Sequence, residues 1–333
     1  MLYTPLCDLL GLRHPIVQAP IGGTASPALA AAVSAAGALG SMAVANYPLE
    51  RLRQAIQAVR AQTAAPFMCN LVLHAPQEDR VALCLAERVP VLGFFWGDPS
   101  PYVAAAHAVG TKVLAQVGSV EEAERAAAAG VDAVIAQGLE AGGHVRGTIG
   151  LVALLPRVVD AVAPLPVIAA GGIADGRGLA AALALGAAGV SVGTRFVASR
   201  EANAHPVYKE LVVAARETDT VYSTLFDRGW PDAPHRTLRN STVRAWEAAG
   251  RPAPGARPGE DEVIYTLART GEAVRRYDAR SPVAEAQGNP EAAALYAGQG
   301  CGLVRDIRPA AEIVAALVAE AEAALARLHA LQR

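Results

Sequence analysis

The chain has 333 residues, of which 53% are hydrophobic and 18% are charged, and this balance excludes a mainly disordered protein. The formal net charge of −2 gives no large basic face, so we expect a small-molecule substrate and no nucleic-acid partner. The length fits one large α/β barrel with an appendage, or two ordinary domains.

Cysteines and the N-terminus carry no motif that changes this picture. The four cysteines, Cys7, Cys69, Cys84 and Cys301, show no metal-ligand spacing, so we predict no metal site and reduced thiols. Residues 1–5 do not resemble a signal peptide. The mainly apolar residues 25–45 are broken by serine, proline and glycine, so they are expected to be core and not a membrane span. We therefore expect a cytoplasmic protein.

Short apolar runs alternate with longer helical patterns over the first two-thirds of the chain. The predicted strands are residues 15–20, 38–45, 66–72, 90–96, 112–117, 133–137, 166–170 and 189–196. The predicted helices are residues 27–36, 49–62, 78–88, 101–109, 120–129, 151–162, 176–185 and 206–215, with Ser119 placed to cap the fifth of them.

This alternation predicts a closed TIM (β/α)₈ barrel. Each strand is a continuous apolar run, which is typical of parallel strands buried on both faces. The alternative is a doubly wound open sheet, but that fold would be expected to stop at about five to seven strands and to carry one dominant G-x-G-x-x-G turn.

The composition changes near residue 216, where Thr, Asp, Arg, Trp and Pro become frequent. We predict that residues 216–308 form a smaller, mainly helical second domain on the substrate side. Residues 309–333 have the apolar spacing of one helix. The barrel domain would then comprise residues 1–215 and 309–333.

In a barrel of this type the active site lies at the C-terminal ends of the strands. Polar residues or glycines follow the apolar strand bodies there. They are Gly22, Gly23 and Thr24 after the first strand, Asn70 on the third, Gln116 on the fifth, Gln137 on the sixth, Gly171 and Gly172 after the seventh, and Gly193 and Thr194 on the eighth.

The turns after the seventh and eighth strands suggest a phosphate site. Glycines there let backbone N–H groups approach an anion, and the following helix N-terminus adds a favourable dipole. The alternative is two ordinary turns that need glycine for a positive φ. The presence of glycines at both of these strands favours the phosphate.

His144 is the candidate catalytic residue. It follows Gly142 and Gly143, which allow the backbone to approach a ligand closely, and it lies in a long loop at a strand end. The remaining histidines lack such neighbours and are expected to be ordinary surface or hydrogen-bonded residues. They are His14, His74, His107, His205, His235 and His329.

Several segments together resemble the nitronate monooxygenase family, formerly called 2-nitropropane dioxygenases. The matching segments are QGLEAGGH at 137–144, QAPIGG at 18–23, PFMCNL at 66–71, PVIAAGGIADGRG at 166–178 and SVGTRF at 191–196. Their order and spacing agree with those of the family. The resemblance covers about residues 8–215 and extends through the tail, and it implies a TIM-like barrel with a smaller second domain that binds FMN noncovalently.

The resemblance also implies roles for individual residues. The backbone of Gly22, Gly23 and Thr24 would lie against the flavin ring, with Asn70 near it and Gln137 and Gly142 in the contacting loop. Gly172 and the stretch Ser191, Val192, Gly193 and Thr194 would hold the phosphate. Gln116, Gly143 and Gly171 complete the expected cofactor-binding set, and His144 takes the catalytic position.

The family reaction oxidises an alkyl nitronate with O₂ to a carbonyl compound and nitrite. A protonated or hydrogen-bonding His144 would neutralise the nitronate, or would act as the base toward a neutral nitroalkane. Similar enzymes are NAD(P)H:quinone reductases and enoyl-[acyl-carrier-protein] reductases, so an FMN-dependent reductase that uses NAD(P)H is the alternative. A non-catalytic flavin-storage or partner-binding protein is a third hypothesis.

Two regions depart from the family pattern or cannot be aligned to it. Val145 separates His144 from Arg146 and Gly147, whereas family members often read A-G-G-H-R-G, so the aim of Arg146 is expected to change. In the second region, two tryptophans and an arginine pair are candidates for the substrate entrance, against the alternative of an ordinary cap with its own small core. They are Trp230, Trp246, Arg275 and Arg276; Asp219, Thr220 and Tyr222 are weaker candidates for approaching the site. A homodimer is left open.

Overall fold

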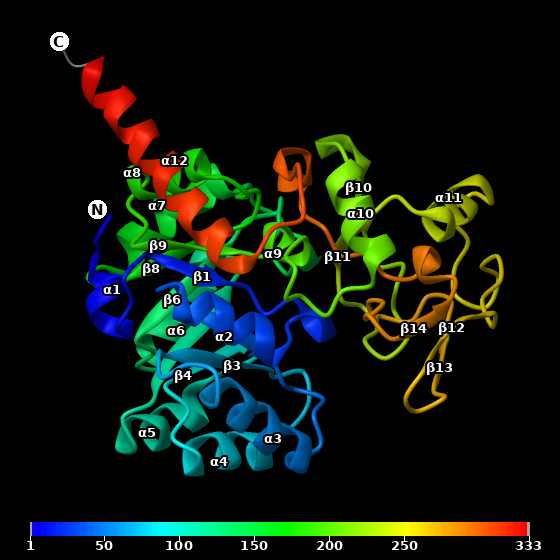
Figure 1. Cartoon of the computed structure of the whole chain (residues 1–333), viewed down its shortest axis with the longest axis horizontal. Coiled ribbons are helices and arrows are strands. Elements are labelled where there is room, and N and C mark those ends of the chain that lie inside the picture. The colour runs from blue at the N-terminus through cyan, green and yellow to red at the C-terminus, as the bar shows by residue number, and fades with distance from the viewer. Residues whose placement is uncertain (1, 332–333) are drawn as a thin grey trace.

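The computed structural model describes residues 2–331, and its largest element is a barrel of parallel strands (Figure 1). Within these residues eight strands are joined in the order β1-β9-β8-β6-β5-β4-β3-β2. Their bounds are β1 Ile16–Gln18, β2 Gly40–Ala43, β3 Phe67–Val72, β4 Val91–Phe95, β5 Lys112–Val117, β6 Ala133–Gln137, β8 Val167–Ala170 and β9 Gly189–Val192. The predicted TIM (β/α)₈ barrel is confirmed, and the open doubly wound sheet is excluded.

A short bridge closes the barrel between β1 and β2. Val17 lies opposite Leu39 in a parallel bridge, and the Gln18 N–H donates to the Leu39 carbonyl at 2.8 Å. The Gln18 side chain reinforces the closure, because its Oε1 accepts the Ser41 N–H at 2.9 Å. The sheet therefore has no unpaired edge at this point.

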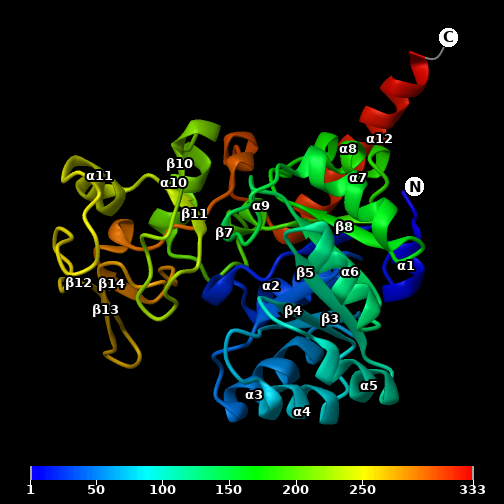
Figure 2. The same cartoon turned by 180° about the vertical axis from the view of Figure 1, so that it is seen from behind.

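Helices cover the outside of the barrel (Figure 2). Their bounds are α2 Pro27–Ala35, α3 Leu49–Arg60, α4 Glu78–Ala86, α5 Ser100–Ala108, α6 Val120–Ala128, α7 Leu151–Val162, α8 Gly176–Ala184 and α10 Pro206–Ala214. Ser119 caps α6 as predicted, since its hydroxyl oxygen accepts the Glu122 N–H at 3.2 Å. The predicted strand 189–196 is too long: β9 ends at Val192, because Gly193 leaves the extended conformation and Thr194–Val197 form the short helix α9.

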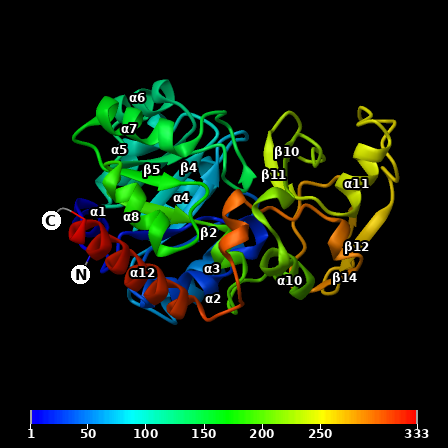
Figure 3. The same cartoon turned by 90° about the horizontal axis from the view of Figure 1, so that it is seen from above.

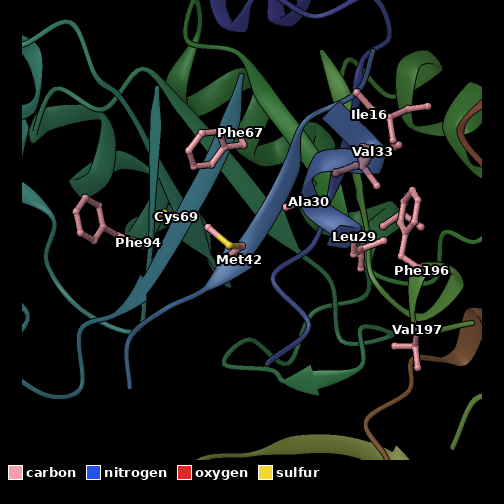
Figure 4. Close-up of a cluster of buried hydrophobic side chains, with 14 of the residues drawn as sticks. Ile16, Leu29, Ala30, Val33, Met42, Phe67, Cys69, Phe94, Phe196 and Val197 are labelled. Atoms are coloured by element: carbon pink, nitrogen blue, oxygen red, sulfur yellow. The ribbon is translucent and has the colours of Figure 1, made fainter. Parts of the chain in front are cut away.

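Buried side chains form two layers, one on each side of the strands. The outer layer lies between strands and helices, and Figure 4 shows part of it, including Ile16, Leu29 and Phe196. The inner layer fills the barrel. It includes Val17, Leu39, Met68, Leu114, Ile135 and Ile168. Helix α1, Pro5–Leu10, adds Leu6 and Leu10 to this inner layer, so the end of the barrel where the strands begin is filled.

Two small antiparallel sheets lie beside the barrel (Figure 3). One joins β10 Thr220–Ser223, β11 His235–Leu238 and β7 Gly143–His144, and the other joins β13 Ala273–Arg275, β12 Val263–Leu267 and β14 Ala286–Gly288. The helical elements of this part are α11 Ser241–Ala248 and 3-10 turns at Glu217–Asp219, Pro290–Ala292 and Gln299–Leu303. A further 3-10 turn, Gly22–Thr24, follows β1.

The prediction that residues 216–308 are mainly helical is therefore wrong. The strands there are only three to five residues long, and β12 pairs with β14 although β13 and a further loop lie between them in the chain. Such short strands leave no alternating period long enough to be distinguished from a short helix.

The C-terminal helix α12, Ala310–Ala330, returns to the barrel and packs against α8 and α2. Gly176 permits the close approach, because a Cβ there would lie 2.3 Å from the Ala321 nitrogen. The last turns of α12 extend beyond the body of the molecule (Figures 1 and 2). The end of the predicted tail helix, residues 332–333, lies outside the described residues.

Candidate active site

A cavity of about 640 Å³ opens at the C-terminal ends of the barrel strands. It is closed from the side by residues of the second region, which comprises residues 216–308. It brings together almost all the predicted site residues. They are Gly22, Gly23, Asn70, Gln116, Gln137, Gly142, Gly143, His144, Gly171, Gly172, Ser191, Gly193 and Thr194. Thr24 and Val192 do not line it: the Thr24 hydroxyl donates to the Ile21 carbonyl, and Val192 is buried in the outer core layer.

Three amide side chains point into the cavity from neighbouring strands. Asn70, Gln116 and Gln137 each stand two residues after a side chain of the inner layer, so the alternation of the strand turns them inward. The Gln137 Nε2 donates to the His144 carbonyl at 3.0 Å, whereas its Oε1 is buried and has no partner among the described residues. Buried acceptors are normally hydrogen-bonded, so this oxygen is available to a ligand.

Glycine turns form the opposite side of the cavity floor. Gly171 and Gly172 have φ values of +111° and +70°, which favour glycine. The first turn of α8 supplies no free donors toward them, because Asp175 accepts the N–H groups of Arg177 and Gly178 and Glu320 accepts that of Gly176. The N–H groups in the first turn of α8 are thus already paired with carboxylates. The backbone N–H groups of the glycine turns remain as donors to a ligand.

A second glycine segment, which the sequence pattern did not assign to the site, completes this floor. Gly298 and Gly300 line the cavity, and the Gly298 N–H donates to the Thr194 hydroxyl at 3.0 Å. A Cβ at Gly300 would lie 2.8 Å from the Gly172 carbonyl oxygen. The glycine-rich run at 298–302 was the one sequence feature that could have pointed to this segment. The order of elements along the chain does not connect that run with the turn after β8.

The His144 loop is held by the second region. β7 pairs with β11, with His144 opposite His235 and Gly143 opposite Arg236. The buried Arg236 guanidinium donates to the Leu139 carbonyl at 3.0 and 3.3 Å. Arg236 is a site-supporting residue that sequence reasoning missed, because its partner lies about a hundred positions away.

Aromatic rings surround the His144 imidazole. The Trp230 ring stacks on it with centroids 3.9 Å apart, and Trp96 and Tyr296 approach to 6.2 and 5.4 Å. Its Nε2 is buried and has no partner among the described residues. Burial, with smaller contributions from His235 and His74, lowers the pKa of His144 to about 3, so the imidazole is neutral at physiological pH.

The two neighbouring histidines differ from His144. His235 is fully buried, and its Nε2 accepts the Phe226 N–H at 3.1 Å while Nδ1 lies 2.9 Å from the Ala233 carbonyl. Its ring is hydrogen-bonded, as expected, but His235 lies in the core on β11 and not at the surface or in a loop. His74 is exposed and stacks on Trp230 with centroids 4.4 Å apart.

Val145 and Arg146 turn away from the cavity. Val145 is buried, with its N–H donating to the Pro234 carbonyl at 2.8 Å. The Arg146 guanidinium pairs with Glu122 at 2.5 Å and lies over the Trp96 ring, 5.7 Å from its centroid. Arg146 is absent from the cavity lining, so the extra residue directs it toward α6.

The second region supplies the outer wall of the cavity. Its apolar part is Tyr265, Leu267, Val274 and Val283, and its charged part consists of the ion pairs Arg280–Glu272 at 2.8 Å and Arg269–Glu285 at 3.8 Å. Trp230 lies in this wall as predicted. Trp246, Arg275 and Arg276 do not, because they bond Pro252, Asp261 and Glu262 on the far side of the region.

Of the weaker candidates, Tyr222 contacts the His144 loop, donating to the Val145 carbonyl at 3.2 Å. Thr220 accepts from Arg236 at 3.2 Å, and Asp219 accepts the Arg216 N–H, so neither reaches the cavity.

Residues 2–331 hold no cluster of ligand side chains able to bind a metal ion. None of their helices is long and apolar enough to span a membrane.

Similarity to known proteins extends over almost the whole chain. The family model for nitronate monooxygenase matches residues 3–80 and 75–320. The nitronate monooxygenase of Pseudomonas aeruginosa is 37% identical, covering 94% of this chain and 97% of that protein. The Mycobacterium tuberculosis protein named (3aS,4S,5R,7aS)-5-hydroxy-7a-methyl-1-oxo-octahydro-1H-indene-4-carboxyl-CoA dehydrogenase is 36% identical, covering 96% of each chain.

Among solved structures, FabK from Thermotoga maritima matches with a TM-score of 0.85 at 37% identity, covering 99% of this chain and 100% of that chain. Proteins named for different reactions are therefore about equally similar to this chain.

Proposed function

The chain belongs to the nitronate monooxygenase family of oxidoreductases, and we propose that it uses FMN to oxidise alkyl nitronates with O₂, releasing a carbonyl compound and nitrite. The observation that carries the proposal is the position of His144. A neutral, desolvated imidazole faces the same cavity as three inward amides and two glycine turns. Such a combination of a proton-handling group with a cradle for a flat, phosphorylated ring supports flavin chemistry.

The residues of the cavity floor fit FMN. A Cβ built on Gly22 or Gly143 would meet no atom within 4 Å, so the backbone borders open space where a ring can lie. The unpaired Gln137 Oε1 is an acceptor for a ring N–H. The backbone of Gly172 and Gly193 suits a phosphate. When bound, FMN would take electrons from the substrate and pass them to O₂.

His144 would orient the substrate. A neutral imidazole offers one N–H donor and one acceptor nitrogen. The donor suits an oxygen of the anionic nitronate, in a site from which the aromatic rings exclude water. With a neutral nitroalkane, the acceptor nitrogen would take the α-proton. The low pKa of His144 favours the neutral hydrogen-bond donor over the protonated imidazole that the sequence left open, and it makes the imidazole a weak base toward a neutral nitroalkane.

A second function has a specific observation in its favour. The Mycobacterium tuberculosis dehydrogenase named for a carboxyl-CoA is as similar to this chain as the Pseudomonas aeruginosa monooxygenase is. An FMN-dependent reductase that takes electrons from NAD(P)H and passes them to a quinone or an enoyl thioester is therefore the alternative. It would use the same amides and glycines, because they would contact FMN in either case.

Oxygen uptake and nitrite release test the proposal. The FMN-loaded protein is mixed with propionate 3-nitronate, and both products are followed against a sample with no nitronate and a sample with NADH alone. We expect nitrite and oxygen uptake only with the nitronate. The absence of nitrite from fully loaded protein would reject nitronate oxidation as the function.

A further inference from the structure

Trp230 reaches the active site from a loop whose base is fixed in the second region. The loop joins β10 to β11, and Arg228 holds its base by pairing with Asp261 at 2.7 Å and by backbone bonds to Tyr277 and Ala279. The tip then crosses to the barrel, where Trp230 lines the cavity. The indole is thus a contact between the two regions.

The indole lies between two imidazoles of the barrel region. It is nearly parallel to His144, at 28°, and to His74, at 17°, with centroids 3.9 and 4.4 Å away. Two imidazoles on the same face of one indole would touch each other, yet His74 and His144 make no ring contact within residues 2–331. They therefore lie on opposite faces of Trp230.

The remaining neighbours meet His144 at steeper angles. Trp96 is edge-on, at 82°, His235 meets it at 70°, and Tyr296 is tilted at 48°. Trp230 is thus the ring that covers a face of the imidazole, and the buried Nε2 of His144 has no hydrogen-bond partner in the described chain that would fix the ring's orientation. Since the outer torsion of a histidine is broad, packing by this face is what sets the ring plane.

We propose that Trp230 is a positioning residue of the active site, fixing the plane of the His144 imidazole and shielding its face from water, with His74 supporting the indole from the other side. This inference rests on the proposed role of His144, but it concerns the state of the imidazole in the FMN-loaded protein and needs no substrate to be tested. Water exclusion by the indole also agrees with the low pKa of His144.

The test is an NMR titration of the His144 ring in the FMN-loaded protein, with the signal assigned by its loss in His144→Gln. In Trp230→Ala we expect the pKa of His144 to rise by at least about one unit toward the ordinary value of ~6.5. Trp230→Phe should retain most of the lowering, because a phenyl ring still covers the face. His74→Ala should give a smaller rise, and Trp246→Ala, the matched loss of an indole away from the site, should give none.

Kinetics supply the second readout. With propionate 3-nitronate, Trp230→Ala should lower kcat by about 10- to 100-fold, since misplaced catalytic groups cost this much, and Trp230→Phe should restore most of it. If Trp230→Ala does not fold, Trp230→Leu replaces it, because leucine fills space without a flat face.

An unchanged His144 titration and an unchanged kcat in the folded alanine or leucine variant would overturn the inference. A protein that releases no nitrite but shows the shifted titration would reject nitronate oxidation alone. Nitrite release with an unchanged titration and kcat in the variant would reject the role of Trp230 alone.

Discussion

The two walls of the cavity are built in different ways. The barrel wall consists of amides on rigid strands and glycines in tight turns, and these groups suit FMN. The outer wall consists of aromatic rings and charged pairs on short strands and loops of the second region. Relatives named for different reactions are about equally similar to this chain. If FMN binds there as proposed, the barrel wall would be common to these different reactions, and we expect the outer wall to select the substrate.

The largest effect is expected at His144, where the two walls meet. His144→Ala should lower kcat/KM for propionate 3-nitronate by about 10²- to 10³-fold, the usual range for loss of a hydrogen-bond donor to a reacting anion, while FMN stays bound because the barrel wall is unchanged. The measurement is steady-state nitrite release, with flavin content by absorbance.

His329→Ala is the matched control, since this histidine lies in the last turn of α12 and should leave turnover at the wild-type level. Unchanged turnover in His144→Ala would favour the flavin-storage or partner-binding hypothesis.

Arg236 tests whether the second region holds the catalytic loop. Arg236→Met leaves the half-buried Leu139 carbonyl without its donor, so the free energy of unfolding should fall by about 1–3 kcal/mol. Urea denaturation of the FMN-loaded protein measures this. Arg228→Met is the control, because its partner Asp261 is largely exposed and the loss should stay within about 1 kcal/mol. Equal losses in the two variants would contradict the anchoring role.

The pH dependence of stability tests the burial of His144. Its pKa is about 3 in the folded protein and ~6.5 when unfolded, so the unfolded chain binds more protons between these values. Stability is therefore lost as the pH falls below about 6.5. From pH 7 to pH 5 the wild type should lose up to about 2 kcal/mol more than His144→Phe, which keeps a ring but does not titrate. Parallel losses would show that His144 is solvated in the folded state.

The smallest effect is expected at Arg146. Its guanidinium pairs with Glu122 outside the cavity, so Arg146→Ala should change kcat/KM by no more than about twofold and stability by about 0–1 kcal/mol. A much larger loss of activity would place Arg146 on the substrate in spite of Val145.

Much of the barrel could be predicted from the sequence, because each strand and helix has its own local signal. Continuous apolar runs mark β4 and β8, and the Ser119 cap marks the start of α6. Helix α1 and the small sheets were missed, because α1 is only six residues long and the strands of the sheets pair across long loops. Where stability comes from contacts between distant segments, local periodicity carries little information.

The same division holds for the candidate site. The positions of Asn70, Gln137 and Gly172 in the cavity could be predicted, because the C-terminal ends of all the strands of a (β/α)₈ barrel lie at the same face. Arg236 and the Gly298–Gly300 contact could not, since each depends on tertiary packing between segments far apart in the chain. The state of His144 also depends on such packing, as Trp230 reaches it from the second region.

Anaerobic stopped-flow mixing tests the proposed reaction most directly. The FMN-loaded protein is mixed in parallel with propionate 3-nitronate, NADH and NADPH, and the flavin absorbance is followed before oxygen is admitted. We expect the nitronate to reduce the flavin rapidly and nitrite to appear when oxygen is admitted, with little change from either nicotinamide. Rapid bleaching by NADH or NADPH, with none by the nitronate, would contradict nitronate oxidation and identify the protein as a reductase.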